Sequence, residues 1–428
     1  MQNVSDELFD VIIVGGGVMG SATAYHASKR GLKTLLIEQF DFLHHRGSSH
    51  GESRTIRANY SKPYYYPLVM ESYTLWQQVQ AQIGYNVYFP AHQLDMGHAH
   101  DHTLLKILEN CSNHGIPHEV LNRCQLAEKF SGRIDFPDDS IGILNEFGGV
   151  IKATKAVAMF QTLAHKNGAV LKDNKEITDI KKDERGVVVV SASNNETFRG
   201  KKCVVTVGAW MSKLKDERGV VVVSASNNET FRGKKCVVTV GAWMSKLVKK
   251  VSGVEIPIKP VEIHVFYWRV KEGHEGDFAI GGDFPTFSSH GGVHVFGTPS
   301  LEYPGLVKIV VDSGDKCDPD KREWGPGVRM NELKEWIKES FNGLVDWREP
   351  VVKQACMYSM TPDNDYVVDF LGGQFGKDVV VGGGFSGHGF KMAPVIGRIL
   401  AELAVDGVPS GGTDISPFGI GRFNNSQK

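Results

Sequence analysis

A glycine-rich turn near the amino terminus has the residue types and spacing of a dinucleotide-binding site. It lies between the apolar run 9–14 and the helical segment 21–30. Its GxGxxG glycines are Gly15, Gly17 and Gly20. They permit a tight turn and a close approach to a pyrophosphate, which the helix amino terminus attracts. Glu38, after the apolar run 33–37, can accept hydrogen bonds from a ribose. An acid there disfavours a 2′-phosphate, which leaves FAD or NAD.

A second glycine-rich segment, near the carboxyl end, favours FAD. Residues 378–381 are typical of a buried strand, and an apolar helix is expected over 394–405. Between them lie Gly384, Gly387, Gly389 and Lys391. The polar loop 47–57 adds Ser49, His50, Arg54 and Arg57. Two strand–glycine–helix units at opposite ends of one chain suit a large cofactor that spans a sheet, whereas a nicotinamide domain is usually contiguous.

Three motifs resemble the monomeric sarcosine oxidase and L-pipecolate oxidase family, FAD-dependent amine oxidases of the D-amino-acid-oxidase-like superfamily. They are GSSHGESRTIR (47–57), ACMYSMTPD (355–363) and GGGFSGHGFK (382–391), and the likeness runs from about Phe9 to Phe423. The resemblance implies a monomeric enzyme with FAD as cofactor, O2 as acceptor, a small secondary amino acid as substrate, and an imine and hydrogen peroxide as products. Eukaryotic members are often peroxisomal, but this chain ends in Ser-Gln-Lys rather than an SKL-type signal. A peroxisomal or a cytoplasmic location therefore stays open.

The resemblance also implies roles for single residues. Cys356 corresponds to the cysteine that attaches the flavin covalently. Arg57 and Lys391 correspond to the pair that grips the substrate carboxylate, and such a clamp orients an amino acid for reaction. Lys308, in the apolar segment 305–308, corresponds to the lysine that assists the reaction with oxygen. Alternation along a strand allows the different reading that this lysine points to solvent.

Further family features surround the flavin. His50 and Arg54 match residues beside the ring system, where they tune its charge distribution. A Gly-Ala-Trp sequence after a buried strand also lies near the flavin in the family. This chain has that sequence twice, with Gly208 and Trp210 in one copy and Gly241 and Trp243 in the other.

The doubled Gly-Ala-Trp belongs to an exact duplication, because residues 182–214 and 215–247 are identical over 33 positions. Structural repeats are similar rather than identical and need about three units to share a core. We therefore expect the fold to need one copy, which would leave 395 residues and a net charge of −4. The sequence does not tell which tryptophan faces the flavin. Spare apolar strands with displaced edges predict lower solubility for the full chain than for a single-copy variant.

Two positions depart from the family pattern. Phe296 replaces a tyrosine that sarcosine oxidases typically carry, and Asp312 replaces a histidine four residues after the lysine. Both changes bear on which amine fits. A different cluster, His98, His100 and His102, alternates in sequence, but the segment is typical of a loop that enters a helix. We therefore expect no metal site.

These residues need an α/β fold to position them. We expect a Rossmann-like FAD-binding domain from 1–84, 145–252 and 350–428. A second α+β domain, 85–144 and 253–349, would place an antiparallel sheet over the flavin, with strands over 261–270, 293–297 and 306–312.

Composition excludes several other functions. A net charge of −1 gives no case for nucleic-acid binding, and six cysteines without CxxC spacing give none for a disulfide framework. No apolar run reaches the roughly 18 residues that span a bilayer, so we expect an intracellular soluble protein with no membrane partner. Two alternatives stay open: a flavin-dependent amine dehydrogenase or other amino-acid oxidase on the same scaffold, and a non-catalytic or misfolded flavin-binding product of the duplication.

Overall fold

The computed structural model describes most of the chain. It covers residues 4–175, 241–321, 325, 327–372, 376–377 and 379–427. Between 176 and 240 it covers only the segments 179–181, 188–191, 197–200, 203–205, 221–224, 230–232 and 236–238.

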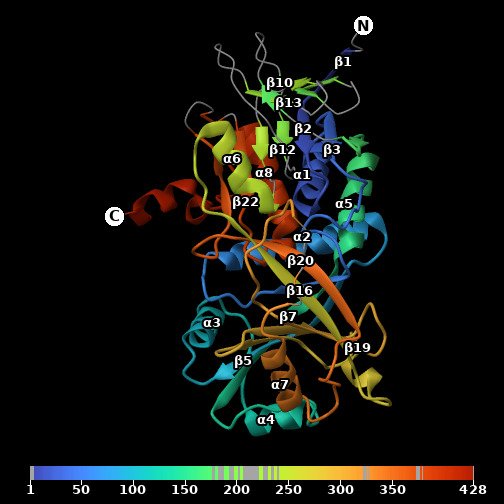
Figure 1. Cartoon of the computed structure of the whole chain (residues 1–428), viewed down its shortest axis with the longest axis vertical. Helices are drawn as coiled ribbons and strands as arrows, with labels where there is room; N and C mark the ends of the chain where they lie inside the picture. Colours follow the sequence, from blue (N-terminus) through green and yellow to red (C-terminus); the bar gives the residue numbers. More distant parts are fainter. Residues whose placement is uncertain are drawn as a thin grey trace.

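Helices gather in the upper half of the molecule and at its lower end (Figure 1). The α-helices are α1 (Val18–Lys29), α2 (Tyr65–Ile83), α3 (His102–Asn113), α4 (Arg123–Lys129), α5 (Ala153–Lys166), α6 (Met244–Ser252), α7 (Met330–Ser340) and α8 (Ala393–Asp406). Short 3-10 helices are η1 (Gly241–Trp243), η2 (Glu275–Phe278), η4 (Phe390–Met392), η5 (Ser416–Phe418) and η6 (Ile420–Gln427).

A seven-stranded sheet carries the predicted dinucleotide-binding half. Its order is β21-β22-β15-β12-β2-β3-β8, and all its pairs are parallel except β21–β22. The strands are β2 (Val11–Val14), β3 (Thr34–Ile37), β8 (Val170–Lys172), β12 (Cys203–Val205), β15 (Cys236–Val238), β21 (Val367–Phe370) and β22 (Val379–Gly383). Fully buried runs such as β2 and β3 are typical of a parallel sheet covered by helices. The Rossmann-like prediction is confirmed.

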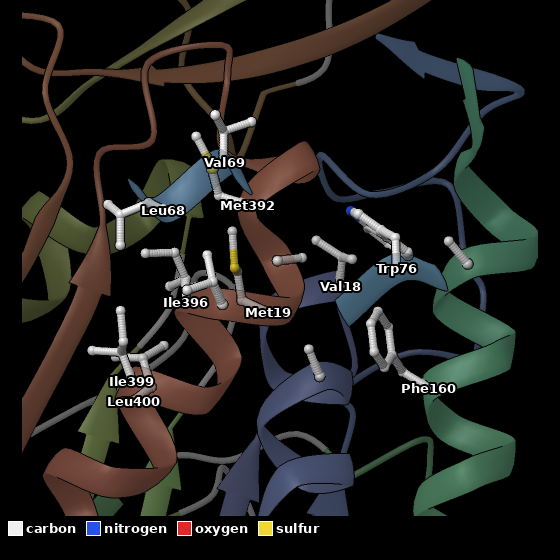
Figure 2. Close-up of a cluster of buried hydrophobic side chains, with 14 of the residues drawn as sticks. Val18, Met19, Leu68, Val69, Trp76, Phe160, Met392, Ile396, Ile399 and Leu400 are labelled. Carbon is white, nitrogen blue, oxygen red and sulfur yellow. The ribbon is translucent and has the colours of Figure 1, made fainter. Parts of the chain in front are cut away.

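One hydrophobic core joins the helices of this half. Figure 2 shows it where α1, α2, α5 and α8 meet. Its labelled side chains are Val18, Met19, Leu68, Val69, Trp76, Phe160, Met392, Ile396, Ile399 and Leu400. Gly397 lets α8 lie close to α1, since a Cβ there would sit 2.7 Å from that of Ala22. The core therefore fixes the amino-terminal and carboxyl-terminal glycine segments relative to each other.

A nine-stranded sheet fills the lower half (Figure 1), with the order β20-β16-β19-β18-β17-β5-β7-β4 and β6 paired to β7. All its pairs are antiparallel except β17–β5. The strands are β4 (Ser53–Arg57), β5 (Tyr88–His98), β6 (Glu119–Asn122), β7 (Ser140–Lys152), β16 (Lys259–Arg269), β17 (Thr286–His290), β18 (Val295–Thr298), β19 (Leu306–Val311) and β20 (Val352–Met360). Both β4 and β20 come from ranges assigned to the FAD-binding domain, and the domain boundaries stay a prediction.

The two copies of the duplicated unit lie side by side. Residues of β12 and β15 pair in parallel, with Cys203 opposite Cys236, and both strands are interior between β22 and β2. A further six-stranded sheet contains β1 (Val4–Phe9), β9 (Asp179–Lys181), β10 (Val188–Ser191), β11 (Thr197–Gly200), β13 (Val221–Ser224) and β14 (Thr230–Arg232). There too the copies pair with each other, β10 with β13 and β11 with β14. Displaced edges are therefore not found for β12 and β15, which have neighbours on both sides.

Candidate active site

A cavity of about 1310 Å³, partly open to solvent, lies between the two glycine-rich segments. This volume includes space that is open to solvent, and residues of both glycine-rich segments line the cavity, which suits an elongated cofactor. The residues singled out from the sequence that line it are Gly17, Gly20, Glu38, Ser49, His50, Arg54, Gly241, Trp243, Cys356, Gly387 and Gly389. Gly241 and Trp243, of the second Gly-Ala-Trp copy, therefore face this cavity. Gly208 and Trp210 lie outside the described residues.

The glycines of both segments are required by the local backbone. Gly15 and Gly384 do not line the cavity, but their φ angles of 103° and 59° hold the turns beside it in the left-handed region. A Cβ on Gly17 would lie 3.2 Å from the Ser49 hydroxyl oxygen, and one on Gly387 would lie 2.6 Å from the Tyr358 ring. Side chains at these positions would crowd the cavity wall, so the glycines keep the backbone accessible to a ligand.

Two side chains tie the amino-terminal glycine turn to the rest of the cavity wall. The Ser49 hydroxyl accepts a hydrogen bond from the Val18 N–H at 3.1 Å, in the first turn of α1. The Glu38 carboxylate is buried and accepts from the N–H groups of Gly16 at 2.6 Å, Gln39 at 2.8 Å and Phe40 at 3.1 Å. Besides its predicted contact with a ribose, Glu38 therefore shapes the turn itself, which the motif did not reveal.

Cys356 lies on β20 in the cavity wall and is 7% exposed. Its Sγ is 3.8 Å from an Arg54 nitrogen, and the Arg54 guanidinium lies 5.5 Å from the centre of the Phe390 ring. The same guanidinium donates to the His50 carbonyl at 2.7 Å. The predicted cysteine, arginine and histidine therefore meet at one end of the cavity.

Lys308 is buried on β19, with 3% of its surface exposed, so the solvent-facing alternative is wrong. Its Nζ donates to the Ser53 carbonyl oxygen at 3.0 Å, which also accepts from Arg54 at 2.7 Å. Burial, reinforced by the charge of Arg54 and partly offset by Glu302, lowers the pKa of Lys308 to about 7. The Phe296 ring, at one of the two departures, lies 5.9 Å from the ammonium.

A second cavity, of about 650 Å³, is lined by Arg57 together with Tyr60, His290 and His294. Arg57 and Lys391 meet at the ring of Tyr60, with the guanidinium 5.1 Å and the ammonium 6.0 Å from its centre. Lys391 is 6% exposed, and burial together with the charge of Arg57 lowers its pKa to about 7. The structure thus brings together the two cations that the sequence paired.

Asp312, the second departure, faces the same cations. Its Oδ2 lies 3.2 Å from the His294 Nδ1. Burial acts to raise the pKa of Asp312, but the hydrogen bond and charge of His294 and the charge of Arg57 outweigh it, so the net shift is downward. A carboxylate ionised at neutral pH therefore stands opposite the predicted clamp.

Of the three alternating histidines, His98 and His100 lie close together, with ring centres 5.5 Å apart. His98 ends β5 and pairs with Asp139 at 2.6 Å, whereas His102 begins α3. Within the part of the chain that the structure describes, no group of three or more His, Cys, Asp or Glu side chains could hold a metal ion. Across the same residues, no helix is both long enough and apolar enough to cross a bilayer.

The residues of the cavity between the two glycine-rich segments fit FAD. The turn at Gly15–Gly17 lies at the amino terminus of α1, which suits a pyrophosphate. Cys356 and Trp243 lie in the wall of the same cavity, so one elongated ligand can reach from the first glycine turn to the second.

Comparisons with known proteins agree with this fit. A family model described as FAD dependent oxidoreductase (DAO) matches residues 10–222 and 212–403, and each range contains one copy of the duplicated unit. The "Probable sarcosine oxidase" of Arabidopsis thaliana is 54% identical over 100% of this chain and 96% of that protein. The human "Peroxisomal sarcosine oxidase" is 32% identical over 97% of each. The fold resembles that of NikD, described as an unusual amino acid oxidase essential for nikkomycin biosynthesis, with a TM-score of 0.76, 22% identity and coverage of 96% and 97%.

Proposed function

Because the chain belongs to the FAD-dependent oxidoreductase family, we propose that it oxidises a small secondary amino acid, such as sarcosine or L-pipecolate, with O2 as acceptor. The observation that carries this proposal is the pair of cations, Arg57 and the buried Lys391, that meet at the ring of Tyr60 beside the second cavity. Two cations at one position suit a substrate carboxylate.

The overall reaction balances without any further reactant. The substrate loses two electrons and two protons from its C–H and N–H bonds and becomes an imine. O2 takes up both and becomes hydrogen peroxide, and water hydrolyses the imine to an amine and a carbonyl compound. FAD, when bound, supplies the chemistry that accepts a hydride equivalent and passes the electrons to oxygen.

The chain's own residues would bind and orient the substrate. Arg57 and Lys391 would hold the carboxylate, so that the carbon–nitrogen bond has one orientation. Lys308 would stabilise negative charge that develops on oxygen, since a buried cation acts strongly in a low-dielectric site. The covalent link through Cys356 is part of the proposal, supported by the exposure of its sulfur to the cavity. Gly241 and Trp243 are proposed as the copy that contacts the flavin.

Asp312 and Phe296 are proposed to select among amines. Asp312 places negative charge opposite the cations, where an N–H of the substrate ammonium can donate to it. Phe296 keeps a ring beside Lys308 but offers no hydroxyl. Together they favour a substrate whose nitrogen keeps a proton to donate.

The test is a peroxide-release screen over sarcosine, N-methyl amino acids, L-proline and L-pipecolate. We expect peroxide with at least one of them, and a KM raised about tenfold or more in Arg57→Ala, the cost of one charged hydrogen bond of about 1.5–3 kcal/mol. The exposed Lys271, beyond the end of β16, provides the matched control Lys271→Met. No peroxide from any amine, with FAD bound, would refute the proposal.

We also propose that the protein works as a monomer, by its similarity to the monomeric sarcosine oxidase of Bacillus sp., and in the peroxisome, by its similarity to the human and mouse peroxisomal sarcosine oxidases. Centrifugation of the purified protein and fractionation of cells that express the full chain would test the two statements separately.

A further inference from the structure

We propose that Tyr60 is a positioning residue whose ring face holds Arg57 and Lys391 together as one anion clamp. The inference rests on the proposed function, because it takes the two cations to be the carboxylate site. It adds a residue that the sequence motifs did not indicate.

Two cations beside one aromatic ring repel each other. Lys391 is almost fully buried, and the pKa of its ammonium falls to about 7, first from burial and then from the charge of Arg57. Something must offset this repulsion if both are to be charged when the substrate arrives. The face of an aromatic ring carries negative charge and attracts cations within about 6 Å. Tyr60 lies within that distance of both, at 5.1 Å and 6.0 Å.

The Tyr60 ring is held rigidly enough to act as a fixed surface. It is 9% exposed and stacks on Tyr65, with ring centres 4.7 Å apart and planes 26° from parallel. The Tyr65 hydroxyl in turn donates to Asp365 at 2.8 Å. The backbone of Tyr60 accepts from the side chain of Asn110 at 2.8 Å. Stacking and hydrogen bonds therefore set the ring before any ligand binds.

The Tyr60 hydroxyl offers a second possible link to the clamp, which the test must separate from the ring face. It lies 3.4 Å from the Nδ1 of His388, in the same loop as Lys391. Tyr366 makes the shorter contact to that nitrogen, at 2.8 Å. His388 is therefore anchored without Tyr60, and we assign the effect to the ring.

The charged and titratable groups around Lys391 predict how its protonation responds. Arg57, on β4, lowers the pKa of Lys391, and Asp312, after β19, raises it. Burial and the charge of Lys391 lower the pKa of His388 to about 3, so this imidazole is neutral and does not titrate near 7. Burial raises the pKa of Tyr60 to about 12, so its own hydroxyl does not titrate there either.

The experiment measures binding of a carboxylate that has no amine, so oxidation does not intervene. Calorimetric titration with furoate, over a pH series on both sides of 7, is applied to the FAD-loaded wild type and to Tyr60→Leu, Tyr60→Phe and Arg57→Ala. Melting temperature and flavin absorbance establish folding, and Tyr60→Met replaces the leucine variant if that one does not fold.

We expect Tyr60→Leu to weaken furoate binding about tenfold, the loss of a buried cation–π contact of about 1.4 kcal/mol. Furoate binding is lost as Lys391 loses its proton, so removal of the ring should also shift that loss to lower pH. Tyr60→Phe, which keeps the ring, should show neither change.

Equal losses in the leucine and phenylalanine variants would overturn the ring assignment in favour of the hydroxyl. Wild-type binding in Tyr60→Leu, with binding weakened in Arg57→Ala, would overturn the role of Tyr60 and leave the proposed function intact. Wild-type binding in Arg57→Ala would instead show that the clamp itself is wrongly placed.

Discussion

Replacement of Lys308 by methionine tests whether a buried cation assists the reaction with oxygen. Methionine keeps the apolar stem and its approximate length but removes the charge and the hydrogen bond to the Ser53 carbonyl. Because the Lys308 side chain is only 3% exposed, its replacement leaves the surface of the protein almost unchanged. Arg54 still donates to the same carbonyl at 2.7 Å, so no buried acceptor is left without a partner.

The size of the effect follows from the cost of keeping this lysine charged. The pKa of Lys308 falls from 10.5 to about 7, which means that the protein disfavours the charged form of this lysine by about 5 kcal/mol relative to water. A negative charge that develops nearby can recover part of that cost. Loss of one preorganised donor to a developing anion commonly costs about 3–4 kcal/mol, or about 10²–10³ in rate. We therefore expect oxygen to reoxidise the substrate-reduced variant about 10²–10³ times more slowly than the wild type.

Stopped-flow absorbance separates the two halves of the reaction. Anaerobic mixing with the amine gives the rate of reduction, which should change by less than about tenfold. Mixing of the reduced protein with oxygenated buffer gives the rate of reoxidation. In the wild type this rate should fall as pH rises through about 7, since Lys308 then loses its proton, and in Lys308→Met it should not depend on pH there. Reoxidation within about threefold of the wild type, in a folded variant with FAD bound, would refute the reasoning and favour a dehydrogenase.

Three further predictions concern the cofactor, the clamp and the duplication. In Cys356→Ser, flavin should be released by acid precipitation, whereas it should stay with the wild-type protein; equal release from both would contradict the covalent link. The KM for the amine should rise as pH increases above about 7, because Lys391 loses the proton that attracts the carboxylate. Lys391→Arg should move that rise to higher pH, since a guanidinium stays charged, and an unchanged profile would count against the assignment. Deletion of 215–247 should keep FAD binding and peroxide release, because the chain retains one complete copy of the unit; loss of bound FAD would show that both copies are needed.

The sequence predicted those features that depend on short stretches of chain. The turn at Gly15–Gly20 and the carboxyl-terminal glycine loop lie within strand–turn–helix units, and their conformations follow from glycine at fixed spacing. Cys356 and Lys308 could be singled out because each lies in a recognisable motif. Both lie near Arg54, which contacts the Cys356 sulfur and donates to the same Ser53 carbonyl as Lys308. That arrangement required the pairing of β16 with β19 and with β20.

Other contacts join segments too far apart for a pattern to reveal. Tyr60 lies under Lys391 only because Tyr65 and the core of α2 and α8 bring the two segments together. Glu302 lies in a loop without periodicity, yet it reaches the surroundings of Lys308. Likewise, β12 pairs side by side with β15, so the backbones of both identical strands have hydrogen-bond partners. From the sequence alone, this outcome could not be told from one in which either copy is looped out.

Strand β4 carries both Arg54 and Arg57, and its register determines which cavity each of them faces. Side chains alternate along a strand, so Arg54 and Arg57, three residues apart, point to opposite faces. Arg54 accordingly lines the cavity between the two glycine-rich segments, beside Cys356, and Arg57 lines the second cavity. The pairing of Arg54 with Ile151 and of Arg57 with Gly148 holds this register. A slip of one residue would turn Arg54 away from Cys356 and Arg57 away from Lys391 at once. With the proposed roles of the two arginines, cofactor binding and substrate binding would depend on the same five-residue strand. A substitution that disturbs its register should then damage both, whereas one that removes a single arginine should damage only one.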